Sequence, residues 1–343
     1  MNILCWIMII LFSCNIFACS CPPPPVEDIG TELAYMHILN TGWEDAIILE
    51  SEGRYALVDA GEPGRGPYIV NYLQRLAGSD KVHLDFVIAT HSHIDHIGGF
   101  PYVINHPDIT IGRAYLKREA NRNPDGTYGG RRYQEFLAAC ESNGIPVVLD
   151  GLDALELSFG HMAITLLNGR PLAGGSTNPE SLCQLVEVGG LKALLAADMV
   201  SEANERYVYQ QIGGMVDLLK VGHHGLSDST GTCFARNLRP AVVIYTNGSS
   251  WAVESHDVTL GEAKGLSGYY ALKAVGAIQY VTTDNGGILA VFGEHGIEYR
   301  AIQEFSRRGD TLDFELRGDI SLRPITEPNT LINRLLNWLL QPC

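Results

Sequence analysis

The feature of this sequence that most restricts its fold is a histidine-rich cluster placed directly after a strongly apolar segment. The cluster is the six residues His-Ser-His-Ile-Asp-His at positions 91–96, and the segment before it is Phe-Val-Ile-Ala at 86–89. The apolar segment predicts a buried strand, so the cluster begins where that strand ends. On extended backbone, His91 and His93 point to the same side because side chains alternate with a period of two. The pair can therefore bind one cation.

Asp95 and His96 complete the cluster. Where the chain curls over after the strand, these side chains would face a second cation, about 3.5–4 Å from the first as in two-metal hydrolytic sites. The following Gly98-Gly99 pair predicts a tight strand-to-helix turn. Imidazole nitrogen with carboxylate oxygen suits zinc first, then manganese or iron. A solvated surface loop is the alternative, but three histidines in six positions are improbable where 11 of 343 residues are histidine.

The composition is that of an ordinary globular protein, with 46% hydrophobic and 18% charged residues. A chain of 343 residues can form one large α/β domain or two small ones. Its formal net charge of −15 weighs against a nucleic-acid partner, because binding to a phosphate backbone depends on clustered lysine and arginine. The one concentration of basic residues could hold a single phosphate group, and it consists of Lys117, Arg118, Arg122, Arg131 and Arg132.

The first 26 residues predict an export leader. An apolar run over residues 3–17 is followed by Ala18-Cys19 and a proline spacer, which resembles a signal peptide and its small-residue exit. The segment ending in Cys19 also resembles a lipobox, so a lipid-anchored cysteine is an alternative. No lysine or arginine precedes Glu27, a departure from both patterns, and residues 4–18 are short for a membrane span of about 20 residues. We expect an exported chain: periplasmic, extracellular or tethered to a membrane through its N-terminus.

Strand and helix patterns alternate over about residues 30–303, which we interpret as one domain. Both halves, about 30–180 and 181–300, run strands first and helices after, which predicts two sheets packed face to face between helical layers. The Asp-Asn-Gly-Gly turn at 284–287 predicts a hairpin into the next strand. Residues 304–343 form a C-terminal extension with a short amphipathic helix. We expect strands at 33–50, 54–60, 84–90, 146–149, 163–167, 182–188, 192–197, 216–221, 241–245, 278–282 and 288–292, and helices at 67–77, 131–142, 201–212 and 259–275.

Two other expected strands end in further candidate ligands. The apolar segment 192–197 runs straight into Asp198, whose two carboxylate oxygens could bridge two cations. The alternative role for Asp198 is the N-cap of the helix that follows. The segment 216–221 leads into Gly-His-His-Gly, where flanking glycines allow a sharp turn. Of His223 and His224, one would ligate metal and the other face substrate, and the spacing does not say which.

Taken together, these segments resemble the metallo-β-lactamase superfamily. The resemblance covers about residues 33–300 and rests on Asp59-Ala60-Gly61, the 91–96 cluster, Ala197-Asp198 and Leu219–Gly225. The last of these segments and Gly42–Ala46 are similar to the branch that contains the hydrolase domain of DNA-uptake competence proteins, near the bacterial phosphorylcholine esterases. The resemblance implies an αββα metallo-β-lactamase sandwich with a dinuclear site at one edge.

The resemblance also implies a role for each candidate. Asp198 would bridge the two metals, and the His-His doublet would complete metal 2. Many relatives supply a third histidine to metal 1 where this chain has Asn178, so His106 and His161 are possible substitutes. Asp59 would orient a ligand imidazole, and His256 is either a substrate contact or an ordinary loop residue. The implied metal ligands are His91, His93, Asp95, His96, Asp198, His223 and His224, and the implied catalytic residues are Asp95, His224 and His256.

The expected chemistry is hydrolysis by a metal-bound hydroxide. A water held by two divalent cations loses its proton near neutral pH, and Asp95 can accept or relay the remaining proton. We expect an exported phosphodiester hydrolase with two zinc ions, or manganese or iron, acting on a small-molecule or phosphodiester substrate. Carboxyl-ester, lactone or β-lactam hydrolysis is an alternative, and a catalytically weak binding protein that retains the fold is another. No protein partner is implied.

Overall fold

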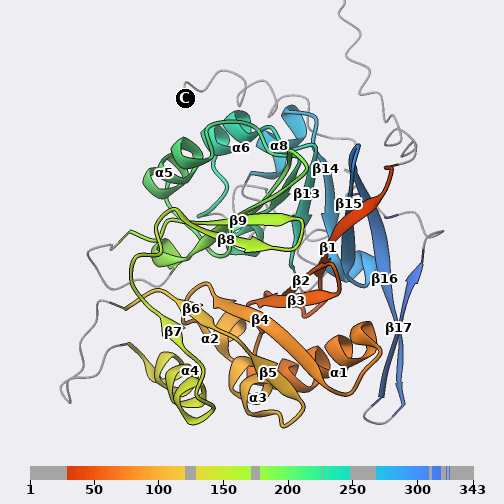
Figure 1. Cartoon of the computed structure of the whole chain (residues 1–343). Helices are drawn as coiled ribbons and strands as arrows, with labels where there is room; N and C mark the ends of the chain where they lie inside the picture. The colour runs from red at the N-terminus through yellow and green to blue at the C-terminus, as the bar shows by residue number, and fades with distance from the viewer. Residues whose placement is uncertain are drawn as a thin grey trace, which may run out of the picture.

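A computed structural model of the chain describes residues 29–119, 129–170, 178–226, 228–247, 268–308 and 311–317, together with Leu322 and Pro324. Over these residues, two β-sheets lie face to face with helices on their outer sides (Figure 1). The predicted αββα sandwich is therefore confirmed. The export leader of residues 1–26, the C-terminal helix and His256 lie outside the described residues. In the described part of the chain, no helix is both long and apolar enough to span a bilayer.

The first sheet has the strand order β17-β16-β15-β1-β2-β3-β4-β6-β7 over the described residues, with β5 beside β4. Strands β3, β4, β6 and β7 run parallel, whereas β1 pairs antiparallel with both β2 and β15. The sheet continues past residue 303, where the sequence placed the end of the domain. Its strands are β1 (Glu32–Ile38), β2 (Ile47–Ser51), β3 (Arg54–Val58), β4 (Val82–Ala89), β5 (Ile109–Ile111), β6 (Ala114–Leu116), β7 (Val147–Val148), β15 (Ile288–Gly293), β16 (Ile297–Arg308) and β17 (Thr311–Arg317).

The second sheet has the order β14-β13-β12-β11-β10-β9-β8 over the described residues. Strands β11 to β14 are parallel neighbours, and β8 to β11 are antiparallel ones. The parallel strands β4, β11 and β12 are followed in the chain by the 91–96 cluster, Asp198 and His224, respectively. The strands are β8 (Leu155–Phe159), β9 (Met162–Leu167), β10 (Cys183–Val188), β11 (Leu191–Leu195), β12 (Leu218–Lys220), β13 (Val242–Tyr245) and β14 (Ile278–Val281).

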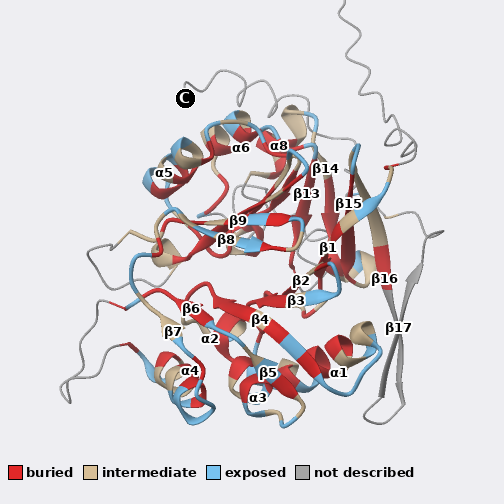
Figure 2. Cartoon of the chain, viewed as in Figure 1, coloured by how far each residue is buried: buried red, intermediate tan, exposed pale blue. Residues whose placement is uncertain are grey.

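Three apolar cores hold the layers together. Helices α1 (Gly66–Ala77), α3 (Phe100–Asn105) and α4 (Arg131–Ser142) cover the first sheet, and α5 (Glu202–Ile212), α6 (Thr232–Leu238) and α8 (Tyr269–Ala274) cover the second (Figure 1). The third core lies between the sheets, so central strands such as β15 are buried on both faces (Figure 2). Burying a large apolar side chain contributes about 1.5–3 kcal/mol, so these cores fix the strand ends firmly.

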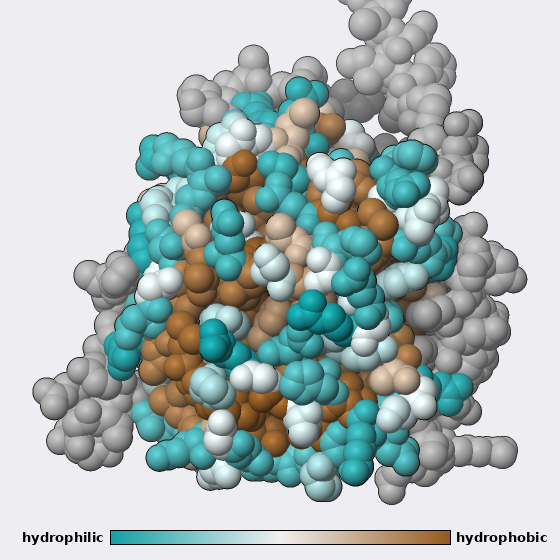
Figure 3. Space-filling model, viewed as in Figure 1, coloured by the Kyte–Doolittle hydropathy of each residue, from teal (hydrophilic) through white to brown (hydrophobic). Residues whose placement is uncertain are grey.

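The outer surface is more polar. In the view of Figure 3, hydrophilic side chains cover much of the described face, and hydrophobic groups come to the surface between them. Helix α1 shows how the sequence produces such layers. Its apolar positions face the core, Pro67 lies in its first turn, and Gly78 ends it with a φ of 60°. That positive φ is one that glycine adopts without strain.

The predicted hairpin at residues 284–287 is wrong. Strand β14 pairs with β13 in the second sheet, whereas β15 lies between β1 and β16 in the first. The short helix α9 (Thr282–Asn285) and the following glycines carry the chain from one sheet to the other. A glycine-rich turn determines where the chain reverses, but burial decides which strand becomes the neighbour. All six residues of β15 are buried, which favours a central position.

Candidate metal centre

The site lies where five strands of the two sheets end. Since carboxyl ends of parallel strands share one edge of a sheet, residues far apart in sequence meet there. Asp198 and His224 lie beside the 91–96 cluster, as the sequence predicted. The polar residues that follow the strands are Asp59 after β3, His91 after β4, Asp198 after β11, His224 after β12 and Thr246 after β13.

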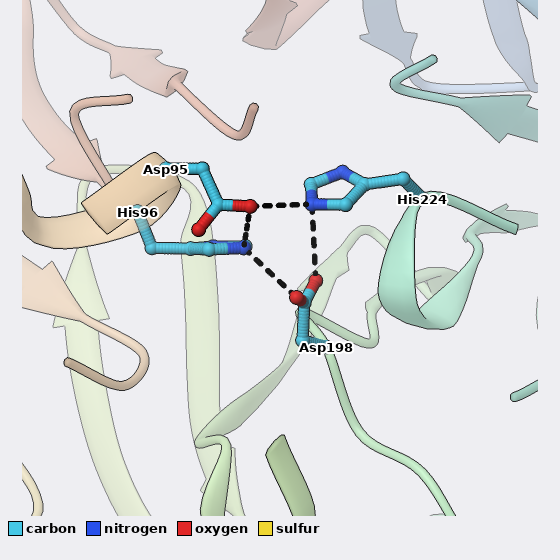
Figure 4. A group of neighbouring side chains, drawn as sticks. All are labelled: Asp95, His96, Asp198 and His224. Carbon is cyan, nitrogen blue, oxygen red and sulfur yellow. Dashed lines mark ion pairs between the residues drawn. The ribbon is translucent and has the colours of Figure 1, made fainter. Parts of the chain in front are cut away.

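One group of four side chains is able to hold a cation (Figure 4). Asp95 and His96 come from the short helix α2 (Ile94–Ile97), and His224 from the 3-10 turn η3 (Gly222–Gly225). His96 Nε2 lies 3.1 Å from Asp198 Oδ2, and His224 Nε2 lies 3.4 Å from Asp198 Oδ1. His224 Nε2 is also 3.4 Å from Asp95 Oδ2. The four ligand atoms point at one common centre, here called site 2.

A second group, here called site 1, consists of His91, His93 and Asp198. The rings of His91 and His93 have centroids 4.7 Å apart, so the two side chains do face the same side as predicted. His91 Nε2 is 3.8 Å from Asp198 Oδ2. Asp198 is the residue common to both groups, which is the bridging position that the sequence predicted.

Buried atoms without hydrogen-bond partners show that these residues fit metal ions. Nε2 of His91, His96 and His224, and Oδ1 of Asp198, are inaccessible to solvent and have no hydrogen-bond partner. Burying a polar atom without a partner is costly, and such atoms need an explanation. Imidazole nitrogen and carboxylate oxygen are common zinc ligands, so coordination of a cation by each group would satisfy them.

Hydrogen bonds behind the rings orient the histidines of both sites. Asp59 accepts from His96 Nδ1 at 2.8 Å and from the Thr90 hydroxyl at 2.7 Å. Because that hydroxyl gives its hydrogen to Asp59, it accepts from His91 Nδ1 at 3.1 Å. Each ring therefore carries its proton on Nδ1 and offers the lone pair of Nε2 to a metal. The predicted role of Asp59 in orienting an imidazole is confirmed.

A second set of supporting residues was missed in the sequence. Asp45 and Lys220 form an ion pair in which both side chains are buried, and Thr246 donates to Asp45 Oδ1 at 2.6 Å. Thr246 in turn lies 3.0 Å from His224 Nδ1. The sequence did contain a sign of this role for Lys220, because the residue ends an otherwise apolar strand. A charged side chain in such a place stays buried only if it is paired.

The charges around the site shift the pKa values of its side chains. Burial lowers the pKa of His224, but the carboxylates of Asp198 and Asp45 outweigh burial and raise it to about 9. Burial likewise opposes a charge on His96, whose pKa is nevertheless raised well above its ordinary value by Asp198 and Asp59. Burial holds the pKa of His91 well below its ordinary value, and the neighbouring His96 adds to this effect. Without metal, site 2 therefore retains protons on His96 and His224.

The backbone at the site is strained. His223 and His224 both have positive φ values, 44° and 52°, and Ala197 beside Asp198 has a φ of 47°. Non-glycine residues rarely adopt this region, and such strain is concentrated at functional sites. Gly222 is needed for a different reason, because a Cβ there would lie 2.7 Å from the Met199 carbonyl oxygen. The histidines, rather than the flanking glycines alone, make the sharp turn.

The two adjacent histidines have different surroundings. His224 is buried and belongs to site 2, whereas His223 belongs to none of the three His/Asp groups found among the described residues, namely site 1, site 2 and the cluster of Asp45, Asp59 and His96. His223 Nδ1 lies 2.7 Å from Asp228 Oδ1, and its Nε2 lies 3.1 Å from Asn178 Nδ2 and 3.8 Å from Asp198 Oδ2. His223 therefore lies beside the ligands, and the structure does not support its predicted role as a metal ligand.

Other predicted candidates lie away from the two groups. His161 is half-exposed, and its Nε2 lies 3.3 Å from Glu52 Oε1. The ring centroids of His106 and Tyr102 lie 5.9 Å apart. Neither histidine belongs to a metal-binding group among the described residues. Where relatives supply a third histidine, Asn178 begins the 3-10 turn η2 (Asn178–Glu180) and contacts His223. It offers an amide, not an imidazole, to this side of the site.

The basic segment is already paired wherever the structure describes it. Lys117 is buried and donates to the carbonyl oxygens of Asn168 and Glu180. Arg118 pairs with Asp150, and both Arg131 and Arg132 pair with Glu135. These contacts do not support the expectation that the segment holds a substrate phosphate. Arg122 lies outside the described residues.

Gly98 and Gly99 serve a purpose other than the predicted turn. Their φ values are −63° and −78°, so neither uses the freedom of glycine to adopt positive φ. A Cβ on Gly99 would lie 2.0 Å from the Ala60 carbonyl oxygen, and one on Gly98 would lie 2.3 Å from the Ile94 carbonyl oxygen. The two glycines allow α2 to pack tightly beside Asp59, and this packing places His96.

Comparison with known families agrees with this geometry. The sequence profile of the Metallo-beta-lactamase superfamily matches residues 44–246, a range that contains every residue of both metal-binding groups. The chain belongs to the metallo-beta-lactamase superfamily. Members of this superfamily are generally hydrolases and bind dimetal centres. The predicted superfamily membership is therefore confirmed.

Two curated relatives share part of their length with this metallo-beta-lactamase chain. The ComE operon protein 3 of Bacillus subtilis is 28% identical over 169 residues, covering 49% of this chain and 20% of the relative. Recombination protein 2 of Haemophilus influenzae is 26% identical over 215 residues, covering 61% of this chain and 24% of the relative. The chain thus spans about a fifth to a quarter of their lengths. These relatives confirm the predicted resemblance to the competence-protein branch.

Solved structures with a similar fold include CmlA, a diiron beta-hydroxylase from Streptomyces venezuelae. It is 16% identical with a TM-score of 0.43, and the match covers 63% of this chain and 45% of CmlA. The MIM-2 metallo-beta-lactamase is 15% identical with a TM-score of 0.38, and the match covers 72% of this chain and 84% of MIM-2. At these identities the likeness concerns the fold alone.

Proposed function

We propose that the protein is a metal-dependent hydrolase of phosphodiesters that uses two divalent cations, with zinc as the first candidate. The observation that carries the proposal is the pair of His/Asp groups that share Asp198 and that present buried Nε2 atoms without partners. Two adjoining sites of this composition suit in-line displacement, in which both the attacking and the leaving oxygen need charge stabilisation.

Each residue has a separate task in this reaction. His91 and His93 would hold one cation, and His96, His224 and Asp95 the other, with Asp198 setting their spacing. The bound cations would polarise the substrate and lower the pKa of a water far below its ordinary value, to about 7. Asp95 is the carboxylate that keeps solvent contact, since its side chain is 27% exposed and that of Asp198 is 1% exposed. We expect Asp95 to accept the proton that the attacking water loses.

The substrate side of the proposal rests on residues beside site 1. His223 lies 3.8 Å from Asp198 and bonds to the Asn178 amide at 3.1 Å, and the second hydrogen of that amide could be donated to a phosphoryl oxygen. An amide in place of a third histidine leaves site 1 with three protein ligands, so substrate oxygen has room to approach. A small phosphodiester suits a chain with a net charge of −15 better than a nucleic acid does. Nucleic acid is the disfavoured phosphodiester substrate, and an oligonucleotide is therefore included in the test.

Export is a second part of the proposal, and it rests on the residues before Glu27. Fractionation of cells that express the full chain would test it. Recovery from the periplasm, the medium or the membrane fraction supports export, and recovery from the cytosol alone contradicts it. Labelling with a radioactive fatty acid would distinguish a lipid-anchored Cys19 from a cleaved leader.

Substrate profiling tests the proposed reaction. The full chain is stripped with chelator, reloaded with Zn²⁺ or Mn²⁺, and assayed on bis(p-nitrophenyl) phosphate, nitrocefin, a lactone and a single-stranded oligonucleotide. We expect metal-dependent hydrolysis of the phosphodiester, abolished in Asp198→Ala and retained in the control His161→Ala, whose side chain lies outside both groups. Hydrolysis of nitrocefin or the lactone alone would contradict the phosphodiester proposal. No turnover of any substrate with two metals bound would favour the binding protein.

A further inference from the structure

Lys220 and Asp45 are charged residues buried outside sites 1 and 2, and Asp45 also lies in a third cluster with Asp59 and His96, behind site 2. Lys220 is 0% exposed and Asp45 2% exposed, and the pair joins segments 175 residues apart in the sequence. Removing a lysine and an aspartate from water is costly even when they pair, so an ion pair at this depth is weak evidence for stability alone. Its place directly behind site 2 suggests a different purpose.

The pair belongs to a continuous chain of contacts that ends at a site-2 histidine. Lys220 Nζ donates to Asp45 Oδ2 and, at 3.2 Å, to the Ala197 carbonyl oxygen. Asp45 Oδ1 accepts from the Thr246 hydroxyl at 2.6 Å. Thr246 Oγ1 lies 3.0 Å from His224 Nδ1. The chain therefore runs from Lys220 through Asp45 and Thr246 to His224.

The direction of each hydrogen bond follows from which groups can donate. A lysine ammonium can only donate and an ionised carboxylate can only accept, so Asp45 receives hydrogens from both neighbours. The Thr246 hydroxyl has one hydrogen, which it gives to Asp45. It must then accept from His224 Nδ1–H, which leaves the lone pair of His224 on Nε2, the atom that faces site 2.

We propose that Lys220, Asp45 and Thr246 are positioning residues for His224, and that they set the affinity of site 2 separately from site 1. The inference rests on the proposed function, because it assumes that the two groups bind metal. Lys220 holds the Asp45 carboxylate in place as the acceptor, and Thr246 transmits that constraint to the ring. Asp59 and Thr90 make a similar arrangement behind His91 of site 1, in which only Thr90 contacts His91 and Asp59 also bonds to His96 of site 2. The two threonines therefore offer a matched pair of probes.

The first experiment titrates the chelator-stripped full chain with Co²⁺, following its visible d–d absorption and competing with a chelator of known affinity. The variants are Thr246→Val, which removes the hydroxyl at nearly constant volume, Thr246→Ser, which retains it, and Thr90→Val as the matched control. Thr246→Val should weaken one of the two Co²⁺ equivalents about 10–100-fold and change its d–d spectrum, whereas Thr246→Ser should restore both. Thr90→Val should weaken the other equivalent instead.

The outcomes separate this inference from the proposed function. Wild-type protein that binds no Co²⁺ contradicts the metal-dependent function itself. Wild-type protein that binds two equivalents, with Thr246→Val unchanged or with both equivalents weakened equally, overturns only the positioning role. Circular dichroism and the melting temperature confirm that each variant is folded before it is titrated.

The second experiment tests the ion pair. Lys220→Met leaves a buried carboxylate without its cationic partner and should lower the melting temperature, whereas Asp45→Asn with Lys220→Met removes both charges and should restore it. We expect the folded double variant still to bind the site-2 Co²⁺ at least tenfold more weakly than the wild type. Wild-type affinity at both sites in the double variant would mean that the pair serves the fold alone, and would overturn the inference for Lys220.

Discussion

His96 Nε2 and Asp198 Oδ2 lie 3.1 Å apart, and both side chains are almost completely excluded from solvent. The other ring nitrogen of His96 already gives its hydrogen to Asp59 at 2.8 Å. Two atoms that carry lone pairs would repel at this distance unless a cation lies between them or the ring holds a second proton. The raised pKa of His96, to which Asp198 contributes, reflects the second possibility. Metal and proton therefore compete for the same place.

The first prediction is that metal binding releases protons. The pKa of His224 is raised from 6.5 to about 9, so the metal-free ring is protonated at neutral pH. Apparent affinity for the site-2 cation should therefore increase as pH rises from 6 and level off near pH 9. In the metal-free protein, the stability that this proton contributes is complete below pH 6.5 and is lost as pH rises through 9. Calorimetry in buffers of different ionisation enthalpy should detect proton release at pH 7, and its absence would contradict the prediction.

The second prediction concerns Glu205, a carboxylate in α5 that is 4% exposed. Burial raises its pKa from 4.5 to about 7, although Glu205 accepts hydrogen bonds from the Gly231 amide. The stability gained because the folded protein favours the protonated carboxyl is thus complete below pH 4.5 and is lost as pH rises through 7. Glu205→Gln retains an acceptor oxygen without the charge, so at pH 8 we expect it to raise the free energy of unfolding by roughly 2–3 kcal/mol. Urea unfolding at pH 4.5 and 8 measures this, and an equal effect at both values would refute it.

The third prediction concerns the close approach beneath α2. Gly99→Ala places a methyl group against the Ala60 carbonyl oxygen, whereas Gly64→Ala adds one where no atom lies within 4 Å. Gly99→Ala should lower the free energy of unfolding by about 1–3 kcal/mol and should weaken metal binding, because α2 carries His96. Gly64→Ala should change stability by less than about 0.5 kcal/mol. Similar unfolding midpoints for the two variants would show that the contact relaxes freely.

The fourth prediction separates the adjacent histidines. His224→Ala removes one of the two imidazole ligands of site 2 and should weaken metal binding there, so that metal content falls toward one equivalent after dialysis against a weak chelator. His223→Ala should retain both equivalents, because His223 bonds to Asp228 and Asn178 rather than completing a group. Elemental analysis of both variants decides the assignment. Loss of metal from His223→Ala equal to that from His224→Ala would return His223 to the ligand set.

Much of the fold could be read from the sequence because its strands are continuous apolar runs and its helices are periodic. The predicted helix at 131–142 coincides with α4, and the strand at 84–90 with β4. Strand β8 was missed because its alternating pattern is short and weak, and β17 because polar residues hide an edge strand. The sheet to which β15 belongs could not be predicted, because local turn chemistry carries no information on distant pairing.

The metal-binding groups were largely predictable for a related reason. Ligands concentrated in one loop, or placed at strand ends, leave a local pattern in the sequence. The choice between His223 and His224 left none, since it depends on the positive φ values of both residues. The contact between Asp45 and Thr246 left none either, because Asp45 lies in the Gly42–Ala46 segment of the resemblance but nothing local pairs it with Thr246. A supporting contact across 201 residues is visible only in three dimensions.

Metal content of the purified full chain, measured by elemental analysis beside Asp198→Ala, tests the central claim most directly. Asp198 is the one residue common to both groups, so its removal should affect both sites. The account predicts about two equivalents of a divalent metal per wild-type chain and markedly less than one in a folded Asp198→Ala variant. A folded wild-type chain that takes up no metal after reloading, or an Asp198→Ala variant that still holds two equivalents, would contradict it.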